Sequence, residues 1–430
     1  MAGAARIRLL DRLISMTRRP PVRMLFFVRE RFPSHRVRIN VLFGKELLRR
    51  GHAIDLVMQA ENAGGPIGAV SWCGRTVFVG RTCRTNSIVG RALRHVLALW
   101  HDILSFRHIR RGGFSLIQVS DKFVTGALAL AVARLHGLKF IFWLTFPVPE
   151  AQLLRARTRT ARYPFLAWIR GRFTGFLLYR VLLPGCDHVL VQSEQMQSDL
   201  AAKGIDPRKM KPVVTGVDLE QFDLRPIDPP ADGRAVTIGY LGTLAADRHL
   251  TVLLDALQLL RQRGVDARLL FIGDADLAKD RQVLEAHAAR LGLLPYLEIT
   301  GFLPQSEAFR RMRKATIGVS PFFPTPILDS TSPTKLVEYM ALRIPVLAND
   351  HPEQRQILRE SRAGVCVPWG ARFFARGAEW LIHLPTEKKA QMAQAGRSWV
   401  EANRSYSRIA DELEATYDQV VHGAGSPNCP

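Results

Sequence analysis

The chain predicts an α/β protein made of two doubly wound, parallel-sheet domains. Short apolar runs typical of buried strands alternate with amphipathic helical stretches along the whole sequence. The length of 430 residues suits two domains of roughly 200 residues each. A Pro- and Asp-rich run at 224–233 is the natural linker between them. We therefore expect domains at 1–225 and 234–404, followed by a helix and tail at 405–430.

In the first half, six short apolar runs predict strands. They lie at 24–28, 54–58, 116–119, 139–144, 187–191 and 211–214. Apolar residues at helical spacing predict helices at 37–50 and 125–136. Because consecutive parallel strands need a crossover helix, this alternation predicts a parallel sheet that is covered on both faces.

The second half repeats the alternation. Strands are expected at 236–241, 267–272, 297–300, 316–320 and 345–348. Helices are expected at 250–263, 277–291 and 333–341, with a last one at 405–421. Ligands bind such sheets at the carboxyl ends of the strands, so the loops after these strands are the first place to look for a site.

Charge is distributed very unevenly along the chain. Residues 1–225 contain 36 Lys and Arg against 15 Asp and Glu, a balance of +21, whereas residues 226–430 contain 24 against 23, a balance of +1. The hydrophobic content of 47% excludes global disorder. Such a basic first half marks an interaction surface, and its partner could be an anionic membrane, nucleic acid or a polyanionic substrate.

The cysteines and the apolar runs favour a cytoplasmic protein. Five cysteines are scattered without the paired spacing of a zinc site or a disulfide framework, which fits a reducing compartment. No apolar run reaches the roughly 18 residues that a membrane span requires. Residues 1–20 mix arginines with leucines and isoleucines, which predicts a basic amphipathic helix and not a secretory signal.

The most informative segment is 332–353. Ser332 is placed to cap a helix, Pro333 suits the first helical position, and an apolar strand follows at 345–348. A helix start presents unpaired backbone N–H groups and a partial positive charge. Lys335 adds a full cation there, so we expect an anion, such as a diphosphate, at this helix start.

The same segment resembles a known donor site. Lys-Leu-Val-Glu-Tyr-Met-Ala at 335–341, followed by Pro-Val-Leu-Ala at 345–348, is similar to the signature of the GT-B glycosyltransferases of retaining family 4 (glycosyl transferases group 1). The subset with a Ser-Pro-x-Lys-x-x-Glu-Tyr-Met-Ala motif is the most similar. The resemblance implies two Rossmann-like domains with an interdomain cleft, a last helix that returns to the first domain, a nucleotide-diphosphate sugar as donor, no metal or other cofactor, and retention of configuration.

The resemblance also assigns roles to individual residues. Glu338 would hold the donor ribose, and Ser332 and Thr334, in the loop and helix start before it, would hold the diphosphate. Arg248 falls where the family has a Lys, so Arg248 and Lys335 together would stabilise the leaving diphosphate. A solvated helix start is the alternative explanation for Arg248. We expect Arg248, Lys335 and Glu338 to form the catalytic set.

Further donor contacts are expected in the turns that follow strands. Tyr-Leu-Gly-Thr-Leu at 240–244 resembles the end of a family strand, although Thr243 replaces the Arg that binds phosphate in the family. The turn at Gly242 and Thr243 and the turn at Gly273 are therefore expected to line the donor site. Backbone at Phe302 and Leu303 is a candidate contact for the base, and core packing explains these two residues equally well.

Two features depart from the family pattern. The family has a second Glu eight positions before Glu338, and Ser330 occupies this place with Asp329 beside it. Either residue could hold the donor sugar. Many members also have a His after the strand equivalent to 139–144, where this chain has none, and Thr145 or Glu150 could instead face the acceptor.

Residues 150–183 form a basic, aromatic segment. Between Arg155 and Arg180 it has seven arginines, six aromatic residues and no acidic residue. A solvated helix face, a stacking site for single-stranded nucleic acid and a membrane-surface helix are the three interpretations. A solvated face needs no aromatic residues, and no nucleic-acid-reading module accompanies the donor motif. We therefore favour an anionic membrane surface and expect no nucleic-acid partner.

These observations predict a glycosyltransferase at the inner face of the plasma membrane. The donor would be a nucleotide sugar, and the acceptor, held by the first domain, would be an anionic, lipid-linked saccharide of cell-surface polysaccharide or glycolipid synthesis. Two alternatives remain open. One is another GT-B enzyme, such as a nucleotide-sugar epimerase that needs no acceptor, and the other is a non-catalytic basic binding protein of the same fold.

Overall fold

The computed structural model describes residues 21–34, 36–83, 87–222 and 236–423. The basic helix expected at 1–20 and the linker expected at 224–233 lie outside these residues. Contacts divide the chain into two compact units. The first comprises Met1–Gln192, Gln197–Val213 and Ile409–Pro430, and the second comprises Ser193–Met196 and Val214–Arg408.

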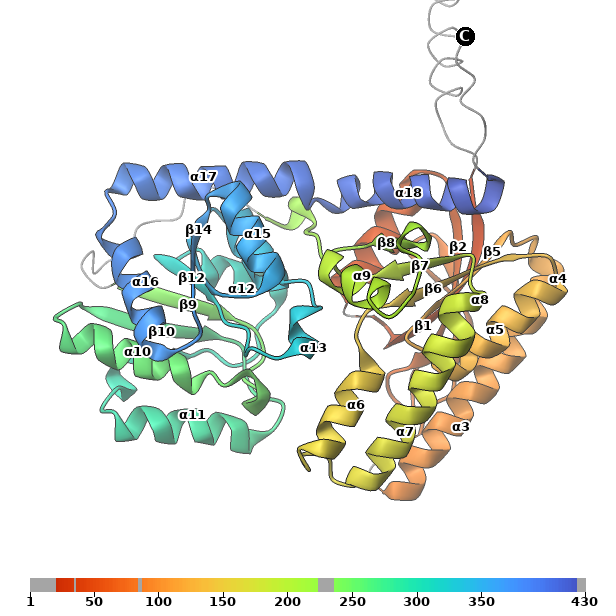
Figure 1. The fold of residues 1–430 in the computed structure, drawn as a ribbon, viewed down its shortest axis with the longest axis horizontal. Helices are drawn as coiled ribbons and strands as arrows, with labels where there is room; N and C mark the ends of the chain where they lie inside the picture. The colour runs from red at the N-terminus through yellow and green to blue at the C-terminus, as the bar shows by residue number, and fades with distance from the viewer. Residues whose placement is uncertain (1–20, 35, 84–86, 223–235, 424–430) are drawn as a thin grey trace, which may run out of the picture. The chain divides into compact units, whose positions relative to one another are not determined.

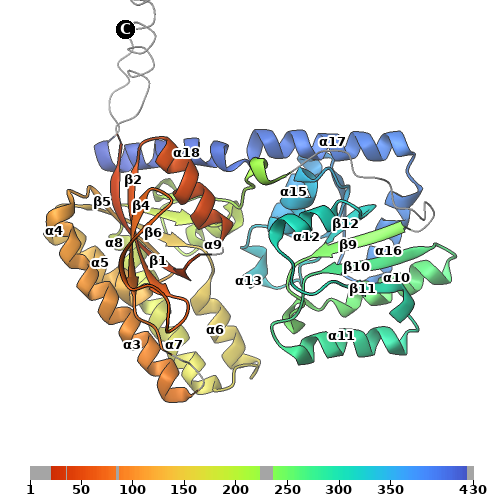
Figure 2. The same ribbon diagram turned by 180° about the vertical axis from the view of Figure 1, so that it is seen from behind.

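The first unit contains an eight-stranded sheet in the order β3-β4-β2-β1-β5-β6-β7-β8 (Figures 1 and 2). The strands are β1 Arg23–Phe32, β2 Ala53–Ala60, β3 Gly68–Trp72, β4 Arg75–Gly80, β5 Leu116–Ser120, β6 Lys139–Leu144, β7 His188–Val191 and β8 Met210–Pro212. All neighbouring pairs are parallel except β3 and β4, which are antiparallel. The wholly parallel sheet expected from the sequence is therefore wrong at this edge. β3 is short and largely exposed, so it lacks the apolar run by which a buried strand is recognised.

Helices pack around this sheet. They are η1 Arg38–Glu46, α2 Leu47–Arg49, α3 Ile88–Ser105, α4 Ile109–Gly112, α5 Phe123–Leu135, α6 Val148–Arg157, α7 Pro164–Phe176, η3 Leu177–Leu182, α8 Leu183–Gly185 and α9 Glu194–Ala201. The helix expected at 37–50 is present, but η1 is a π-helix and only its end, α2, is α-helical. Sequence reasoning missed α3, which Ser87 caps by accepting a hydrogen bond from the backbone N–H of Gly90 at 2.9 Å.

The second unit has a six-stranded sheet in the order β11-β10-β9-β12-β13-β14, with every pair parallel. The strands are β9 Val236–Leu241, β10 Ala267–Ile272, β11 Leu297–Ile299, β12 Ile317–Ser320, β13 Val346–Asn349 and β14 Gly364–Val367. The main helices are α10 Thr251–Gln262, α11 Ala278–Arg290, α12 Gln305–Met312, α13 Pro326–Asp329, α14 Thr334–Ala341, α15 Pro352–Ser361, α16 Ala371–His383 and α17 Thr386–Asn403.

This second sheet is buried on both faces, as expected for a doubly wound domain. Leu269 and Phe271 belong to one buried cluster together with residues of α10 and α16. The alternate residues of the same strand, Leu270 and Ile272, belong to another cluster together with residues of α12, α14 and α15. Because successive strand residues point to opposite faces, the two clusters lie on the two sides of the sheet. The predicted α/β class with two doubly wound domains is confirmed, and both sheets are parallel apart from the β3–β4 pair.

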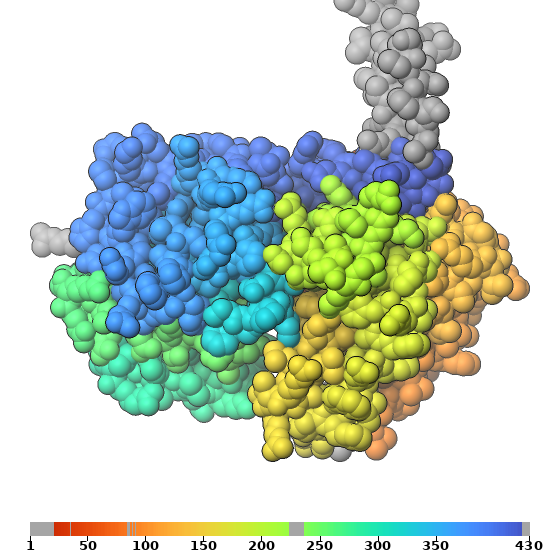
Figure 3. Space-filling model, viewed as in Figure 1, coloured from red at the N-terminus to blue at the C-terminus, as the bar shows by residue number. Residues whose placement is uncertain are grey.

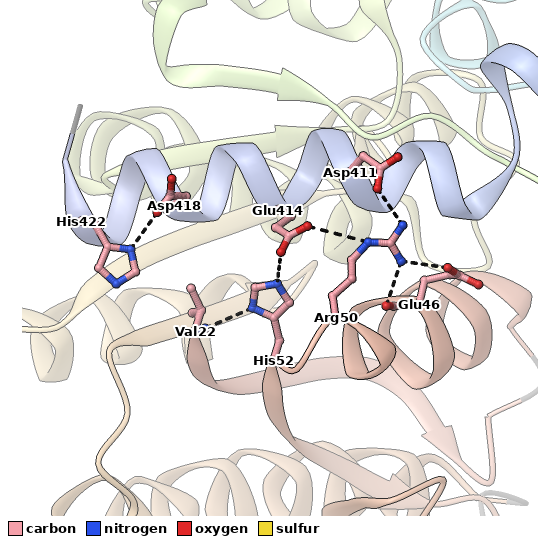
Figure 4. A network of polar contacts seen from close by, with 8 residues as sticks. All are labelled: Val22, Glu46, Arg50, His52, Asp411, Glu414, Asp418 and His422. Carbon is pink, nitrogen blue, oxygen red and sulfur yellow. Dashed lines mark hydrogen bonds and ion pairs between the residues drawn. The ribbon is translucent and has the colours of Figure 1, made fainter. Parts of the chain in front are cut away.

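The last helix, α18 (Tyr406–His422), packs on the first unit from Ile409 onwards. The Arg50 guanidinium lies 2.7 Å from Asp411 and 2.8 Å from Glu46, and His52 lies 3.3 Å from Glu414 (Figure 4). Further along the helix, the buried Tyr417 hydroxyl donates to Gln118 on β5 at 2.7 Å. The C-terminal helix is thus attached to the first sheet by polar contacts as well as by apolar packing.

Candidate active site

The donor-like segment forms a helix, α14, that begins directly after a buried loop. Thr334 is the first helical residue and Pro333 precedes it without a side-chain cap. Ser332 does not cap, so this expectation is wrong. Its hydroxyl instead donates to Glu353 at 2.8 Å and accepts from the backbone N–H of Thr215 at 3.1 Å. The first N–H groups of α14 therefore have no capping side chain.

Lys335 lies against the end of β9. An ideal Cβ atom on Gly242 would lie 2.7 Å from Lys335 Cε and 3.3 Å from its Nζ, so a side chain at this position would displace the lysine. The lysine Nζ is also 5.4 Å from the ring centroid of Tyr240. The structure thus brings together two residues, Gly242 and Lys335, that the sequence assigned to the donor site separately.

Two tyrosine side chains, Tyr240 and Tyr339, lie between the end of β9 and the segments that carry Arg248 and α14. Arg248, at the end of the short helix η6 (Ala246–Arg248), has a buried Nε with no hydrogen-bond partner in the described part of the chain. Burial raises the pKa of Tyr240 to about 12, and the charge of Arg248 opposes this shift. The Tyr240 hydroxyl donates to the Thr243 carbonyl at 3.1 Å. The Tyr339 hydroxyl, from α14, accepts from the backbone N–H of Leu241 at 2.8 Å.

The three expected catalytic residues interact electrostatically. Burial, then the positive charge of Arg248, lowers the pKa of Lys335 to about 7, and Glu338 opposes this shift. Burial raises the pKa of Glu338 to about 7, and Lys335 opposes that shift. Arg248, Lys335 and Glu338 therefore form one cluster, the donor cluster, in which two cations lie close together beside one acid. Such a cluster is unfavourable without an anion and favourable with one.

The remaining predicted donor residues lie around this cluster or in loops nearby in the sequence. An ideal Cβ on Gly273 would lie 2.4 Å from the Gly242 carbonyl oxygen, so the ends of β9 and β10 meet there. Thr334 and Phe302 are exposed, whereas Leu303 packs partly against the core. No contact in the described residues ties Phe302 to the donor cluster.

Asp329 and Ser330 end the short helix α13 and the turn after it. The buried Ser330 carbonyl accepts a hydrogen bond from the Ser193 hydroxyl at 2.7 Å. Asp329 acts electrostatically on His351, whose ring nitrogen lies 2.9 Å from the Leu328 carbonyl. This loop is therefore held in place by buried hydrogen bonds.

Sequence reasoning missed the ion pair that supports this loop. Glu353 and Arg404 are 2.9 Å apart and both are largely buried. Burial raises the pKa of Glu353, while Arg404 and Ser332 oppose the shift. Glu353 thereby fixes Ser332 immediately before α14. Glu353 could have been found from its place in the informative segment 332–353, but its partner Arg404 lies far away in the sequence.

The first unit contains two cavities at the carboxyl edge of its sheet. One, of about 560 Å³, is lined by Arg29, Arg38 and Thr145 among others, and the second has a volume of about 620 Å³. Thr145, expected to face the acceptor, therefore lies at a cavity wall. Glu150, the alternative, does not line either of them and is bound to Lys203 at 2.6 Å and to the Tyr179 hydroxyl.

Within the described residues, no helix is both long enough and apolar enough to cross a bilayer.

The fold consists of two doubly wound units, and the donor cluster lies at the strand ends of the second. Two such units define the class of GT-B proteins. Family models match both halves of the sequence. Residues 38–221 match Glycosyltransferase Family 4, and residues 235–383 match Glycosyl transferases group 1. Together these matches support a GT-B glycosyltransferase of family 4 and group 1.

Several known proteins are similar in sequence. WcaL of Escherichia coli (strain K12), which is named for colanic acid biosynthesis, is 26% identical over 55% of this chain and 57% of its own length. The amylovoran biosynthesis glycosyltransferase AmsK of Erwinia amylovora is 27% identical over 41% of this chain and 43% of its own. EpsD of Bacillus subtilis (strain 168) is 26% identical over 77% and 80%. The chain thus spans about half the length of WcaL and AmsK.

Solved structures share the fold across nearly the whole chain. Sucrose-phosphate synthase from Thermosynechococcus elongatus has a TM-score of 0.70 at 16% identity, covering 94% of this chain and 100% of its own. HepE from Anabaena, in complex with UDP, has a TM-score of 0.66 at 15% identity, covering 93% and 100%. Identities this low establish the fold alone.

Proposed function

We propose that this protein transfers a sugar from a nucleotide-diphosphate donor to a membrane-associated, lipid-linked saccharide in cell-surface polysaccharide or glycolipid synthesis, with retention of configuration. The observation that carries the proposal is the donor cluster of Arg248, Lys335 and Glu338. It places two cations and one acid at the start of a helix and at the end of a parallel strand, where ligands of such sheets bind.

The cluster suits a nucleoside diphosphate. Lys335 and Arg248 repel each other, and a diphosphate between them would convert this repulsion into attraction. The positive end of α14 adds to the effect. Glu338 lies one helical turn beyond Lys335 and can accept hydrogen bonds from ribose hydroxyls. HepE, which shares this fold, was solved in complex with UDP, and this supports a nucleotide donor for the present chain.

The chemistry needs no residue that the cluster lacks. The bond between the sugar and the donor phosphate breaks, and a new bond forms to the acceptor oxygen on the same face of the sugar. The acceptor proton passes to the departing phosphate oxygen, whose charge Arg248, Lys335 and the helix start stabilise. Asp329 or Ser330 would hold the sugar hydroxyls.

The acceptor assignment rests on charge and on the similar proteins. The first half of the chain carries nearly all of the net charge of +22, which favours an anionic acceptor and the anionic cytoplasmic face of a membrane. WcaL and AmsK are named for the synthesis of colanic acid and amylovoran. A peripheral position at the inner membrane face follows from a lipid-linked acceptor.

Two measurements test the proposal. In a thermal-shift screen of UDP, GDP, dTDP and their sugars, at least one compound should raise the unfolding midpoint, because ligands that bind the native state stabilise it. With the matching radiolabelled donor, wild-type protein should transfer label to extracted membranes, and Glu338→Ala should transfer it about 10- to 100-fold more slowly. Conversion of the donor without membranes would instead indicate an epimerase, and donor binding without any turnover would indicate a binding protein.

A further inference from the structure

The two cavities of the first unit share one wall. The cavity of about 560 Å³, here called the polar cavity, and the cavity of about 620 Å³, here called the amphiphilic cavity, are both lined by Arg29, Arg31 and Asp121. Arg29 and Arg31 lie in β1, and Asp121 directly follows β5, which pairs with β1. Both cavities therefore open beside the carboxyl ends of the central strands, where ligands of doubly wound sheets bind.

Four arginines line the amphiphilic cavity: Arg29, Arg31, Arg94 and Arg170, here called the arginine cluster. Burial lowers the pKa of His95, which also lines the cavity, and the charges of all four arginines lower it further. Arg29 also lowers the pKa of Arg170, together with burial. Guanidinium groups from a strand, from α3 and from α7 thus gather around one space although they repel one another.

The carboxylates that line the amphiphilic cavity already have hydrogen-bonding partners within the protein. Asp102 is 2.7 Å from Lys122 Nζ and accepts a hydrogen bond from the Thr125 hydroxyl at 2.7 Å. Asp121 accepts from the backbone N–H of Thr145 at 2.9 Å and from its hydroxyl. Among the described residues, no carboxylate forms an ion pair with Arg29, Arg94 or Arg170. Burial raises the pKa of Asp121 and Arg29 opposes this shift, whereas burial lowers the pKa of Arg31 and Glu61 opposes that one, so these two arginines have an acidic neighbour. The lining of the cavity still carries more positive than negative charge, which suits an anion with several charges, such as a diphosphate.

Apolar side chains line another part of the amphiphilic cavity. They include Leu99 from α3, Phe123 from α5, Val148 from α6 and Phe173 from α7. Phe173 is 52% exposed, so the cavity continues onto the outer surface of the first unit. A ligand with an anionic head and a hydrocarbon chain would satisfy both kinds of wall.

That outer surface is unusually apolar. On α7, Phe165, Leu166, Trp168, Ile169 and Phe176 are exposed, and on α3, Val89, Leu93, Val96 and Trp100 are exposed. α3 and α7 lie side by side in both ribbon views and share the amphiphilic cavity (Figures 1 and 2). Figure 3 shows α6 and α7, in yellow, on the surface of the first unit. Exposed aromatic side chains among arginines are typical of a surface that enters the headgroup layer of a membrane.

The polar cavity differs in its lining. Arg36, Arg38, Glu61 and Thr145 contribute hydrogen-bonding groups. Glu30 also lines it, and its buried Oε2 has no hydrogen-bond partner in the described part of the chain. A buried oxygen without a donor is costly unless a ligand hydroxyl supplies one. Hydroxyl-rich sugars provide such donors.

We infer that these cavities hold a lipid diphosphate-linked saccharide in a fixed direction. The diphosphate binds the arginine cluster at the shared wall, the hydrocarbon chain follows the apolar wall between α3 and α7 towards the membrane, and the saccharide occupies the polar cavity. The inference rests on the proposed function and deepens it by naming the linkage and the orientation of the acceptor. It also assigns Arg94 and Arg170 as specificity-determining residues.

The test measures binding of a soluble probe, tritiated farnesyl diphosphate, to the full chain. Arg94→Gln and Arg170→Gln should each weaken binding at least tenfold. Arg172→Gln is the matched control, because Arg172 is exposed on the same helix as Arg170 and does not line the cavity. Equal losses in all three variants would overturn the inference, since they would show only a general effect of positive charge.

A second set of variants separates the hydrocarbon contact from the phosphate contact. Phe173→Ser should weaken farnesyl diphosphate binding at least fivefold without changing competition by inorganic pyrophosphate, whereas Phe165→Ser, outside the cavity, should leave both unchanged. If pyrophosphate competes as well as farnesyl diphosphate does, the site is a plain phosphate site and the inference is wrong. Stronger competition by a single-stranded dT20 oligonucleotide, or by phosphatidylglycerol vesicles, would overturn it in favour of nucleic acid or of a bulk lipid surface.

Donor binding distinguishes this inference from the proposed function. The arginine cluster and the donor cluster belong to different units, so the Arg94 and Arg170 variants should keep the midpoint shift caused by the best nucleoside diphosphate. Donor binding without farnesyl diphosphate binding would refute the inference and leave the function standing. Absence of any nucleotide binding would refute the proposed function itself.

Discussion

When the nucleotide-diphosphate donor binds, the protein should take up a proton on the Lys335 side chain. In the unliganded protein, burial and Arg248 lower the pKa of Lys335 from 10.5 to about 7. A diphosphate in contact with the ammonium group favours its charged form and should restore the pKa towards its ordinary value. Between these two pH values the complex then binds more protons than the free protein, and the difference approaches one in the middle of the range.

The magnitude follows from this difference. With a pKa of about 7, Lys335 is about one-tenth protonated at pH 8 and about one-hundredth at pH 9. The dissociation constant of the nucleoside diphosphate should therefore rise about tenfold between pH 8 and pH 9, which is about 1.4 kcal/mol. Glu338, whose pKa is also about 7, is already ionised over this range and adds little to the slope.

Isothermal titration calorimetry can measure both quantities. The nucleoside diphosphate that gives the largest thermal shift would be titrated at half-unit steps from pH 8 to pH 9.5, in buffers of different ionisation enthalpy. Wild-type protein should take up nearly one proton at pH 8.5. Lys335→Arg keeps a permanent charge, so its affinity should not vary with pH. A dissociation constant that is constant over this range in the wild type, with no proton uptake, would refute the assignment of Lys335.

The other predictions concern single contacts. Glu338→Ala should lower kcat/KM for the donor about 10- to 100-fold, as expected for lost hydrogen bonds to a charged group, and an unchanged kcat/KM would contradict its role; far-UV circular dichroism checks the fold. Gly242→Ala should displace Lys335, because the new Cβ would lie 2.7 Å from its Cε at a φ of +146°, and nucleotide affinity should fall at least tenfold. Gly264→Ala is the control, with φ +82° but no atom within 4 Å, and it should reduce stability by about 1 kcal/mol without affecting affinity. Tyr417→Phe removes the hydroxyl that donates to Gln118 and should lower the free energy of unfolding by about 1–3 kcal/mol in urea titrations; an unchanged value would show that this hydrogen bond does not help to hold α18.

Much of the fold follows from the sequence because buried parallel strands are continuous apolar runs. β6, β9 and β10 have the limits expected from their residues, since almost all of their side chains face a core on one side or the other. The same reasoning fails where burial is partial. The β3–β4 hairpin exposes much of β3 to solvent, and α3 exposes an apolar stripe, so neither follows the usual pattern of its element.

Part of the donor cluster could be predicted from the sequence, because Lys335 and Glu338 are neighbours on one helix, and its role in donor binding stays a prediction. What only the tertiary structure decided is which distant groups complete each site. The Ser332 hydroxyl binds Glu353 and does not cap α14. Gly242 leaves room for Lys335. Arginines from β1, α3 and α7 line one cavity. Local sequence fixes the conformation of each segment, but the pairing of segments depends on how the sheet orders its strands, and no spacing along the chain encodes that order.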